Sequence, residues 1–273
     1  ASMQISHVFR GEEHLSNTLR QILILNALKM PVPEYGHLSI ILGQDKKKLS
    51  KRDGAVSVDD YRQQGYLPEA MINYLSLLGW TPEHEISRLD QLCAAFDGQK
   101  LHAAAPIFDP VKLHWVNGQW VQAMSDDVFW SQLLNYMDPV YLKRLPEDPD
   151  WRQRCINWLK PLAHPLKDMN AQLAQVMETP VWPDEEPLTE REQHIFQAWF
   201  HGLESYSVTF LDPEQVKKQL KEVGERVNLK GKALFLPMRL VMTGQKQGGD
   251  LTTLLSLIPI ERQKAYLTQR LSS

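Results

Sequence analysis

The sequence lacks any apolar run that approaches the ~18 residues of a membrane-spanning helix. Its longest apolar-rich runs, Ile22–Leu28 and Met71–Leu78, have the length of short helices and are interrupted by polar residues. The first residues also lack the basic region, apolar core and small-residue cleavage site of a secretory signal. These absences argue against a membrane protein and against an exported one, so we expect a cytoplasmic protein with no membrane partner.

Cysteine is almost absent as well. Cys93 and Cys155, the only two, lie far apart in the sequence and show no metal-ligand spacing. We therefore expect no bound zinc or other metal, and two buried thiols in a reducing compartment.

A strong excess of charge is also missing: the net charge is −3, which neither indicates nor excludes a nucleic-acid partner. Any RNA contact must come from local clusters, because phosphates respond to local potential.

The first 57 residues have the pattern of an α/β unit. Ala1-Ser2 ahead of Met3 has the form of residues left by removal of a tag, and we leave it out of the fold argument. Ile5–Phe9 and Leu38–Leu42 are short, apolar runs that predict buried strands, and Glu12–Leu28 carries apolar residues at helical spacing. The order strand, helix, strand predicts part of a parallel sheet.

The remainder of the sequence predicts helices, bounded by capping residues, glycines and prolines. We expect them at Val58–Gly65, Leu67–Leu78, Arg88–Phe96, Asp109–Val121, Ser125–Tyr136, Trp151–Met177 with breaks at Pro161 and Pro165, Leu188–Leu203, Asp212–Val227, Lys232–Thr243, Asp250–Leu257 and Pro259–Leu271. Ser87 is the expected cap of the third of these helices. Glu178–Pro187, with three prolines and four acidic residues, predicts a linker.

The strongest chemical signal is the basic segment Lys46–Gly54, which has five cations in seven residues. Such a run is typical of a solvated surface loop. It is equally the composition of a polyphosphate clamp, because ammonium groups stabilise the charge that builds on a leaving pyrophosphate. Its place after a predicted strand favours a ligand site, since ligands of α/β sheets bind beyond the carboxyl ends of strands. No G-x-x-x-x-G-K-[ST] motif is present, so a Walker P-loop is excluded.

Two blocks resemble the glutamyl-tRNA synthetases. His7–Thr18 (HVFRGEEHLSNT) resembles that family's H-V-x-R-G-E-D-H-L-x-N-T segment, and Lys48–Arg52 (KLSKR) resembles its form of the class I K-M-S-K-S signature. Further similar blocks follow in order at Gly65–Ala70, Phe108–Gly118 and Gly231–Gly244. The family's H-I-G-H signature and the zinc-binding cysteines of some members are absent. The chain therefore resembles the C-terminal portion of a bacterial-type glutamyl-tRNA synthetase, without the N-terminal half of the catalytic domain.

The resemblance implies a mainly α fold: a short α/β remnant of a Rossmann-type catalytic domain, then a helical stem-contact unit, then an all-helical anticodon-binding region. The implied domains are residues 1–57 with the K-L-S-K-R loop, residues 58–125 for the stem contact, and two anticodon-binding modules at residues 126–187 and 188–273. A glutaminyl-type or archaeal-type relative would have a β-barrel anticodon domain instead.

The resemblance also implies the chemistry of a glutamate–tRNA ligase, which attaches glutamate to its tRNA through a glutamyl-adenylate made from ATP. Lys48 and Lys51 would be catalytic, within an ATP-binding segment made of Lys48, Leu49, Ser50, Lys51 and Arg52. The expected partners are L-glutamate, ATP with Mg²⁺ as the substrate complex, and the tRNA for glutamate. This chain alone is expected to be inactive, because half of the active site is missing from its sequence.

Arg10 and His14 are the expected glutamate-binding residues. A guanidinium after a strand can hold a carboxylate through two parallel hydrogen bonds, and the resemblance places Arg10 on the glutamate substrate with His14 near the amino-acid pocket. From the residues alone, Arg10 paired with Glu12 or Glu13 is as good an interpretation, and His14 is equally well a capping or surface residue.

The expected anticodon-reading residues are Leu162 and His164. Members of the family often have an arginine just before the segment that resembles Leu166–Met169, and that arginine helps to select the third anticodon base. Here Leu162 occupies the place, with His164 nearby. This departure implies weaker discrimination against the tRNA for glutamine.

Two alternatives to a piece of the ligase remain open from the sequence. The chain could be a natural non-catalytic, tRNA-binding or regulatory relative of the ligase, although a start in mid-domain behind a tag-like dipeptide favours an engineered piece. It could also be a helical scaffold with an incidental lysine loop, which would leave the matched blocks unexplained. Most of the eight tryptophans are expected to be core or domain-interface residues rather than platforms for base stacking. The late basic residues form either an ion-paired, solvated helix face or a phosphate contact, and they are Lys217, Lys218, Lys221, Arg226, Lys230 and Lys232.

Overall fold

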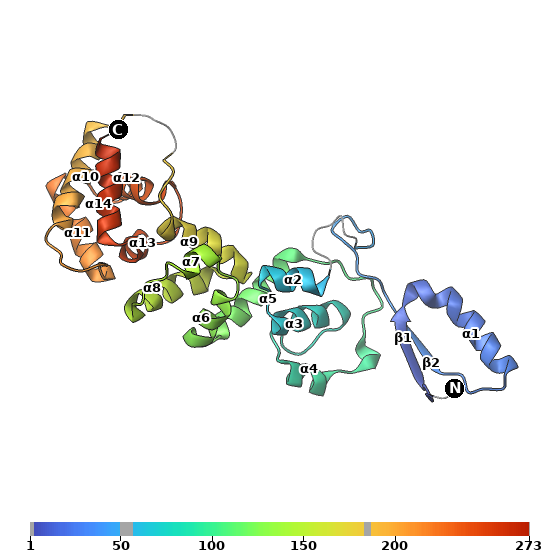
Figure 1. Cartoon of the computed structure of the whole chain (residues 1–273). Helices are drawn as coiled ribbons and strands as arrows, with labels where there is room; N and C mark the ends of the chain where they lie inside the picture. The colour runs from blue at the N-terminus through green and yellow to red at the C-terminus, as the bar shows by residue number, and fades with distance from the viewer. Residues whose placement is uncertain (1–2, 50–56, 183–186, 273) are drawn as a thin grey trace. The chain divides into compact units, whose positions relative to one another are not determined.

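The computed structural model describes residues 3–49, 57–182 and 187–272 (Figure 1). The chain divides into two compact units, Ala1–Trp120 and Val121–Ser273. Each unit is described by itself below.

The first unit begins with two parallel strands joined by a helix, as the sequence predicts (Figure 1). The strands are β1 His7–Gly11 and β2 Glu34–Leu38. Between them lie the 3-10 turn η1 Glu12–His14 and the helix α1 Leu15–Ala27. The helix ends ahead of Pro31 and Pro33, and Lys29 at φ 54° turns the chain back toward the second strand. In the parallel register Arg10 stands opposite His37, so both side chains belong to the same end of the sheet.

The second strand lies elsewhere than predicted. The apolar run Leu38–Leu42 was expected to form it, but the strand is the segment EYGHL at Glu34–Leu38. Leu42 forms only isolated bridges, with Lys48 and with Ile107. Pairing with β1 determines which residues are extended here, and backbone hydrogen bonds do not require an apolar segment.

The predicted burial around this small sheet is wrong. Phe9 is 59% exposed, and on α1 Leu19 and Leu23 are 63% and 60% exposed. Their spacing is that of a helix with a packed apolar face, yet no described element of the chain covers that face. Apolar periodicity shows that a surface is made to be covered, and it does not say which segment covers it.

The rest of the first unit is helical. Its elements are α2 Val58–Gln64, α3 Pro68–Gly79, α4 Leu89–Ala95, η3 Gly98–Lys100 and α5 Pro110–Ala123. Ser57 and Asp60 cap the start of α2 reciprocally, and Gly65 ends it in the left-handed conformation at φ 88°. Ser87 is not the cap of α4: the helix begins at Leu89, so its N-cap is Arg88, and the Ser87 hydroxyl donates to His84 O at 2.8 Å while its N–H donates to buried Asn73 Oδ1 at 3.2 Å.

The second unit is all helix in its described residues (Figure 1). Its first part comprises α6 Asp126–Leu134, α7 Pro139–Leu142, α8 Pro149–Leu159, η4 Lys160–Leu162, η5 Leu166–Asp168 and α9 Met169–Met177. Its second part comprises α10 Glu190–Leu203, α11 Pro213–Arg226, α12 Lys232–Thr243, α13 Leu251–Leu257 and α14 Ile260–Leu271. Among the described residues from 57 onward no strand occurs, which confirms the mainly α fold. The division into four functional domains stays a prediction.

Most of the tryptophans are core residues, as expected. Trp151 and Trp199 are almost completely buried, and Trp80, Trp130 and Trp158 are at most 9% exposed. In the last helices a polar network accompanies this core: the Trp199 indole N–H donates to the Gln263 side chain at 3.1 Å, and both residues are fully buried.

The two thiols differ, contrary to the expectation that both are buried. Cys155 is buried, and burial raises the pKa of its thiol. Cys93 is exposed, because α4 is short and turns Leu92 rather than Cys93 to the interior. In the part of the chain that the structure describes, no helix has the length and apolar character needed to span a membrane.

Candidate functional site

Arg10 lies in a polar cluster at the end of the two parallel strands. Its guanidinium donates to the Thr18 hydroxyl at 2.5 Å and lies 5.3 Å from the centre of the Tyr35 ring. The same hydroxyl is 2.7 Å from His37 Nε2. Thr18 is buried while Arg10 is partly exposed, so the arginine is held by a fixed hydroxyl and an aromatic face. A guanidinium restrained in this way is suited to hold a carboxylate.

The other predicted glutamate contact adjoins this cluster through its backbone. The His14 carbonyl accepts a hydrogen bond from the Thr18 hydroxyl at 3.2 Å, while the His14 ring is exposed and lies 3.4 Å from the Asn17 side-chain amide. His14 is also the N-cap residue of α1. Among the described residues Arg10 makes no ion pair with Glu12 or Glu13, which were its alternative partners.

The start of the basic loop is a tight turn on the same unit. The Gly43 N–H donates to Lys47 O at 2.8 Å, and Lys46 N–H donates to Gly43 O at 2.9 Å with Lys46 at φ 60°. Leu42 and Lys48 form an antiparallel bridge that closes the turn. The segment 42–48 thus presents three exposed lysines on a hydrogen-bonded backbone.

The remainder of the predicted ATP-binding segment is placed only in part. Lys48 is exposed and Leu49 is half-buried, with the Leu49 N–H donating to Ile41 O at 3.1 Å. Ser50, Lys51 and Arg52 lie outside the described residues. Lys47 has the Asp45 carboxylate 3.9 Å away, whereas Lys46 and Lys48 make no ion pair among the described residues. Two ammonium groups are therefore available at this turn for a polyphosphate.

The two predicted anticodon readers lie in the second unit, just after α8. Leu162 ends the turn η4 and is 39% exposed, and His164 follows it on the surface. Between them Ala163 is buried, so the segment is anchored while its neighbours face outward. An exposed leucine at a turn offers shape and apolar contact to a base, and no hydrogen-bond donor.

The structure reveals a further polar cluster that the sequence did not single out. Among the described residues, Trp158 Nε1, Gln175 Oε1 and Arg239 Nη1 are buried and without a hydrogen-bond partner. Arg239 also donates through Nη2 to Gly249 O at 2.6 Å. Gly248 has φ 156°, a conformation that other residues rarely adopt, and a Cβ there would lie 2.7 Å from Arg239 Nη1.

Buried polar atoms without partners are costly and mark a place where a polar ligand or water belongs. The sequence contains no local signal for this cluster, because Trp158, Gln175 and Arg239 are far apart in the chain.

Comparison with known proteins finds two family matches along the chain. Residues 1–115 match the family described as tRNA synthetases class I (E and Q), catalytic domain. Residues 129–269 match the family described as anticodon binding domain, which is more than half of the chain. The clusters around Arg10 and the basic loop fall in the first match, and those around Leu162 and Arg239 fall in the second.

Individual relatives give the same picture. A glutamate–tRNA ligase of Natranaerobius thermophilus is 37% identical over 95% of this chain, and one of Bdellovibrio bacteriovorus is 34% identical over 94%. A crystal structure of a glutamate tRNA ligase from Elizabethkingia meningosepticum, in complex with its amino acid, has a TM-score of 0.83, with 27% identity and 99% of this chain covered. The chain spans about half the length of the relatives it matches: 55%, 53% and 58% of these three.

Proposed function

Because the chain belongs to the glutamyl-tRNA synthetase family of class I aminoacyl-tRNA synthetases, we propose that it supplies the tRNA-binding and ATP-phosphate parts of an ATP-dependent glutamate–tRNA ligase. The observation that carries this proposal is one continuous alignment, over 95% of the chain, that includes both a catalytic and an anticodon-binding match. Residues 1–57 would belong to the catalytic domain, 58–125 would contact the tRNA stem, and 126–187 and 188–273 would bind the anticodon.

The proposed chemistry has two steps. A glutamate carboxylate oxygen attacks the α-phosphorus of ATP, a new O–P bond forms, and the bond to pyrophosphate breaks. A ribose hydroxyl at the end of the tRNA then attacks the glutamyl carbonyl, and AMP leaves. In both steps the catalytic contribution is positioning and neutralisation of charge.

The residues of this chain would divide these tasks. Arg10, held by Thr18 and Tyr35, would orient a carboxylate of glutamate. Lys48 and Lys51 would neutralise the phosphates of ATP, which arrives with Mg²⁺ as part of the substrate. No covalent intermediate with the protein is required.

Within the whole chain, the second unit is expected to provide the surface that binds tRNA. We expect the purified chain to bind the tRNA for glutamate in a filter-retention assay. The logarithm of its association constant should fall linearly with the logarithm of the salt concentration. The slope should be about 0.7 for each single-stranded phosphate that the protein neutralises. The matched control is the same tRNA with its anticodon loop replaced, which should bind more weakly. Equal affinity for the two RNAs at every salt concentration would contradict anticodon-arm binding.

A substitution at Leu162 tests the proposed base reader. Leu162→Arg introduces a planar donor that can form paired hydrogen bonds with a base edge, whereas leucine cannot. We expect the variant to favour the glutamate tRNA over the glutamine tRNA by about 1 kcal/mol more than the parent chain does, the size of one modest polar contact.

The control for this test is Leu162→Lys, which adds the same charge without the planar fork. It should strengthen the binding of both tRNAs by similar factors and leave their ratio unchanged. If the parent already discriminates strongly and Leu162→Arg leaves the ratio as it was, another residue reads that base, and His164→Ala is the next variant to measure.

A further inference from the structure

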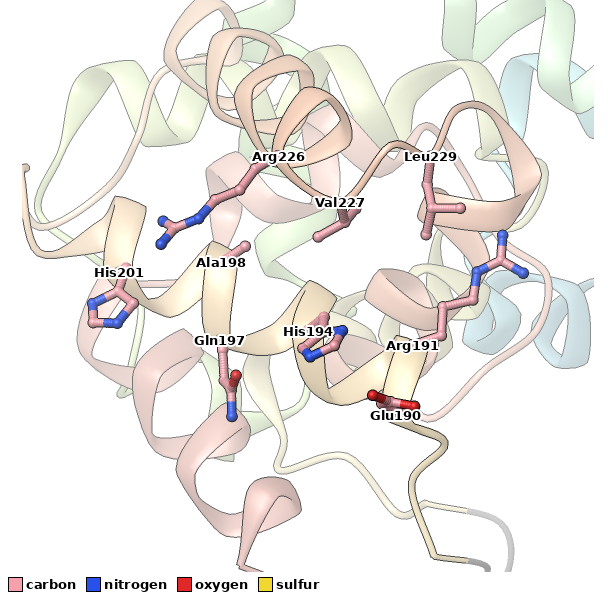
Figure 2. Close-up of a pocket in the computed structure, with 9 residues that line it drawn as sticks. All are labelled: Glu190, Arg191, His194, Gln197, Ala198, His201, Arg226, Val227 and Leu229. Atoms are coloured by element: carbon pink, nitrogen blue, oxygen red, sulfur yellow. The ribbon is translucent and has the colours of Figure 1, made fainter.

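A groove on the second unit is lined by two arginines and two histidines that the proposed function does not use (Figure 2). It has a volume of about 710 Å³ and lies between the outer face of α10 and the end of α11. Arg191, His194 and His201 are placed along α10, and Arg226 reaches in from the last turn of α11 (Figure 2). A groove of this size takes a ligand as large as a nucleotide.

The two arginines of the groove differ from the lysines of α11. All three lysines of that helix are paired with glutamates about one turn away, and the pairs are Lys217–Glu214 at 2.7 Å, Lys218–Glu222 at 3.9 Å and Lys221–Glu225 at 3.9 Å. Arg226 makes no ion pair or hydrogen bond among the described residues, nor do Arg191 and His194. An ion-paired, solvated surface therefore explains the three lysines and leaves the groove unexplained.

The floor of the groove has a different chemistry from its rim. Ala198 on α10, together with Val227 and Leu229 after α11, provides an apolar surface between the two guanidinium groups (Figure 2). Glu190 is the one carboxylate among the lining residues, and it stands at the N-terminal end of α10 next to Arg191. His201 lies 2.9 Å from the Glu204 carboxylate and so is already engaged at one ring nitrogen.

We propose that this groove binds a single-stranded nucleotide of the RNA partner. Arg191 and Arg226 would contact successive phosphates, and the base would lie on the apolar floor beside the His194 ring. Guanidinium groups suit phosphate because their fork donates two parallel hydrogen bonds, and imidazole and guanidinium planes stack on unpaired bases. This inference rests on the proposed binding of tRNA by the same unit. It adds a contact beyond the anticodon candidates at Leu162 and His164.

The test is tRNA binding by the whole chain carrying Arg191→Gln and Arg226→Gln together. We expect the affinity for the glutamate tRNA to fall roughly tenfold, as for the loss of two exposed charge-assisted contacts. The slope of the logarithm of affinity against the logarithm of salt concentration should also become shallower by about 1.4, because two phosphate contacts at about 0.7 each are lost. The matched control is Lys217→Gln with Lys218→Gln, which removes two paired cations from the same helix and should change the affinity less than twofold.

The outcomes separate this inference from the proposed function. Unchanged affinity and salt slope in the arginine double variant, while the parent binds tRNA, would overturn the groove and leave the proposed function intact. A parent chain that binds no tRNA would overturn the proposed function itself. Titration with cytidine monophosphate tests whether the groove binds a free nucleotide instead of RNA. Tight binding of this probe that the arginine variant loses, with tRNA affinity unchanged, would make the groove a small-molecule site and refute RNA binding there.

Discussion

Glutamate-dependent exchange of pyrophosphate into ATP by this 273-residue chain is expected to remain at the rate of the protein-free reaction. Ligase catalysis requires an acceleration of at least about a millionfold, so this chain alone is expected to lose at least that factor in the rate of adenylate formation. The physical reason is that an α/β sheet binds its substrates where two halves of the sheet meet. The described residues form only two parallel strands, β1 and β2, and the chain spans 55% of the length of the Natranaerobius ligase.

The measurement must show that the sample is folded. Binding of the glutamate tRNA by the same preparation serves as the positive control, and exchange is then followed with and without glutamate. Exchange that requires glutamate and rises in proportion to the protein concentration would refute the expectation. It would mean that Arg10 and the basic loop suffice for adenylate formation.

The exposed apolar face of α1 also supports the expectation that this chain is inactive alone. Leu15, Leu19 and Leu23 are each about 60% exposed, in a helix whose spacing is that of a packed face. Burying one such side chain contributes about 1.5–3 kcal/mol, so a surface of this kind is normally covered.

The helices were predictable because local chemistry determines their ends. Ser57 and Gly65 mark the start and end of α2, Ser125 caps α6, and Gly244 follows α12 in the left-handed conformation. A cap satisfies backbone groups within one turn, so a short stretch of sequence contains the whole signal.

The strands and the burial were less predictable because they depend on distant partners. The apolar run Leu38–Leu42 looked more like a strand than Glu34–Leu38 does, yet hydrogen bonding to β1 selected the latter. Ser87 looked like a cap, but the helix begins one residue later than expected, and the Ser87 N–H donates to Asn73, fourteen residues earlier in the chain. Neither preference can be read from local composition.

The features of the candidate site likewise divide into those that local composition predicts and those that depend on the fold. The cations of the basic loop were evident from composition, whereas the contacts that restrain Arg10 needed the fold. Thr18 is a buried residue whose hydroxyl the Arg10 guanidinium contacts, and the sequence does not indicate that contact. The unpartnered polar atoms of Trp158, Gln175 and Arg239 could not be found from sequence, because burial without a partner is a property of three-dimensional packing.

Replacement of Gln263 by alanine is expected to destabilise the second unit by about 3 kcal/mol, counting about 1 kcal/mol for each buried group left without a partner. Gln263 is fully buried and makes three hydrogen bonds. Its Oε1 accepts from Trp199 Nε1 at 3.1 Å, and its Nε2 donates to Leu255 O and Ile258 O at 2.8 Å each. These bonds connect α10, the end of α13 and α14, so one side chain holds three elements in register.

Two further variants separate hydrogen bonding from packing. Gln263→Leu nearly restores the volume and leaves the same three groups unpaired, so it should be destabilised by about 3 kcal/mol, as Gln263→Ala is, if polar satisfaction is the main effect. Gln193→Ala, an exposed glutamine on α10, is the matched control and should change stability by less than about 0.5 kcal/mol. The midpoint of thermal unfolding should fall by about 2–4 °C for each kcal/mol in a unit of this size.

The Gln263 network also connects stability to function, because the groove between α10 and α11 and the loop around Gly249 are both built on these helices. We expect Gln263→Ala to weaken tRNA binding only at temperatures where the unit begins to unfold, and to leave the salt dependence at low temperature unchanged. Calorimetry and filter retention at two temperatures measure both quantities. Full stability in Gln263→Leu would show that packing and not hydrogen bonding holds Trp199. Weakened tRNA binding by a fully folded Gln263→Ala chain would mean instead that the network positions the RNA-contacting residues directly.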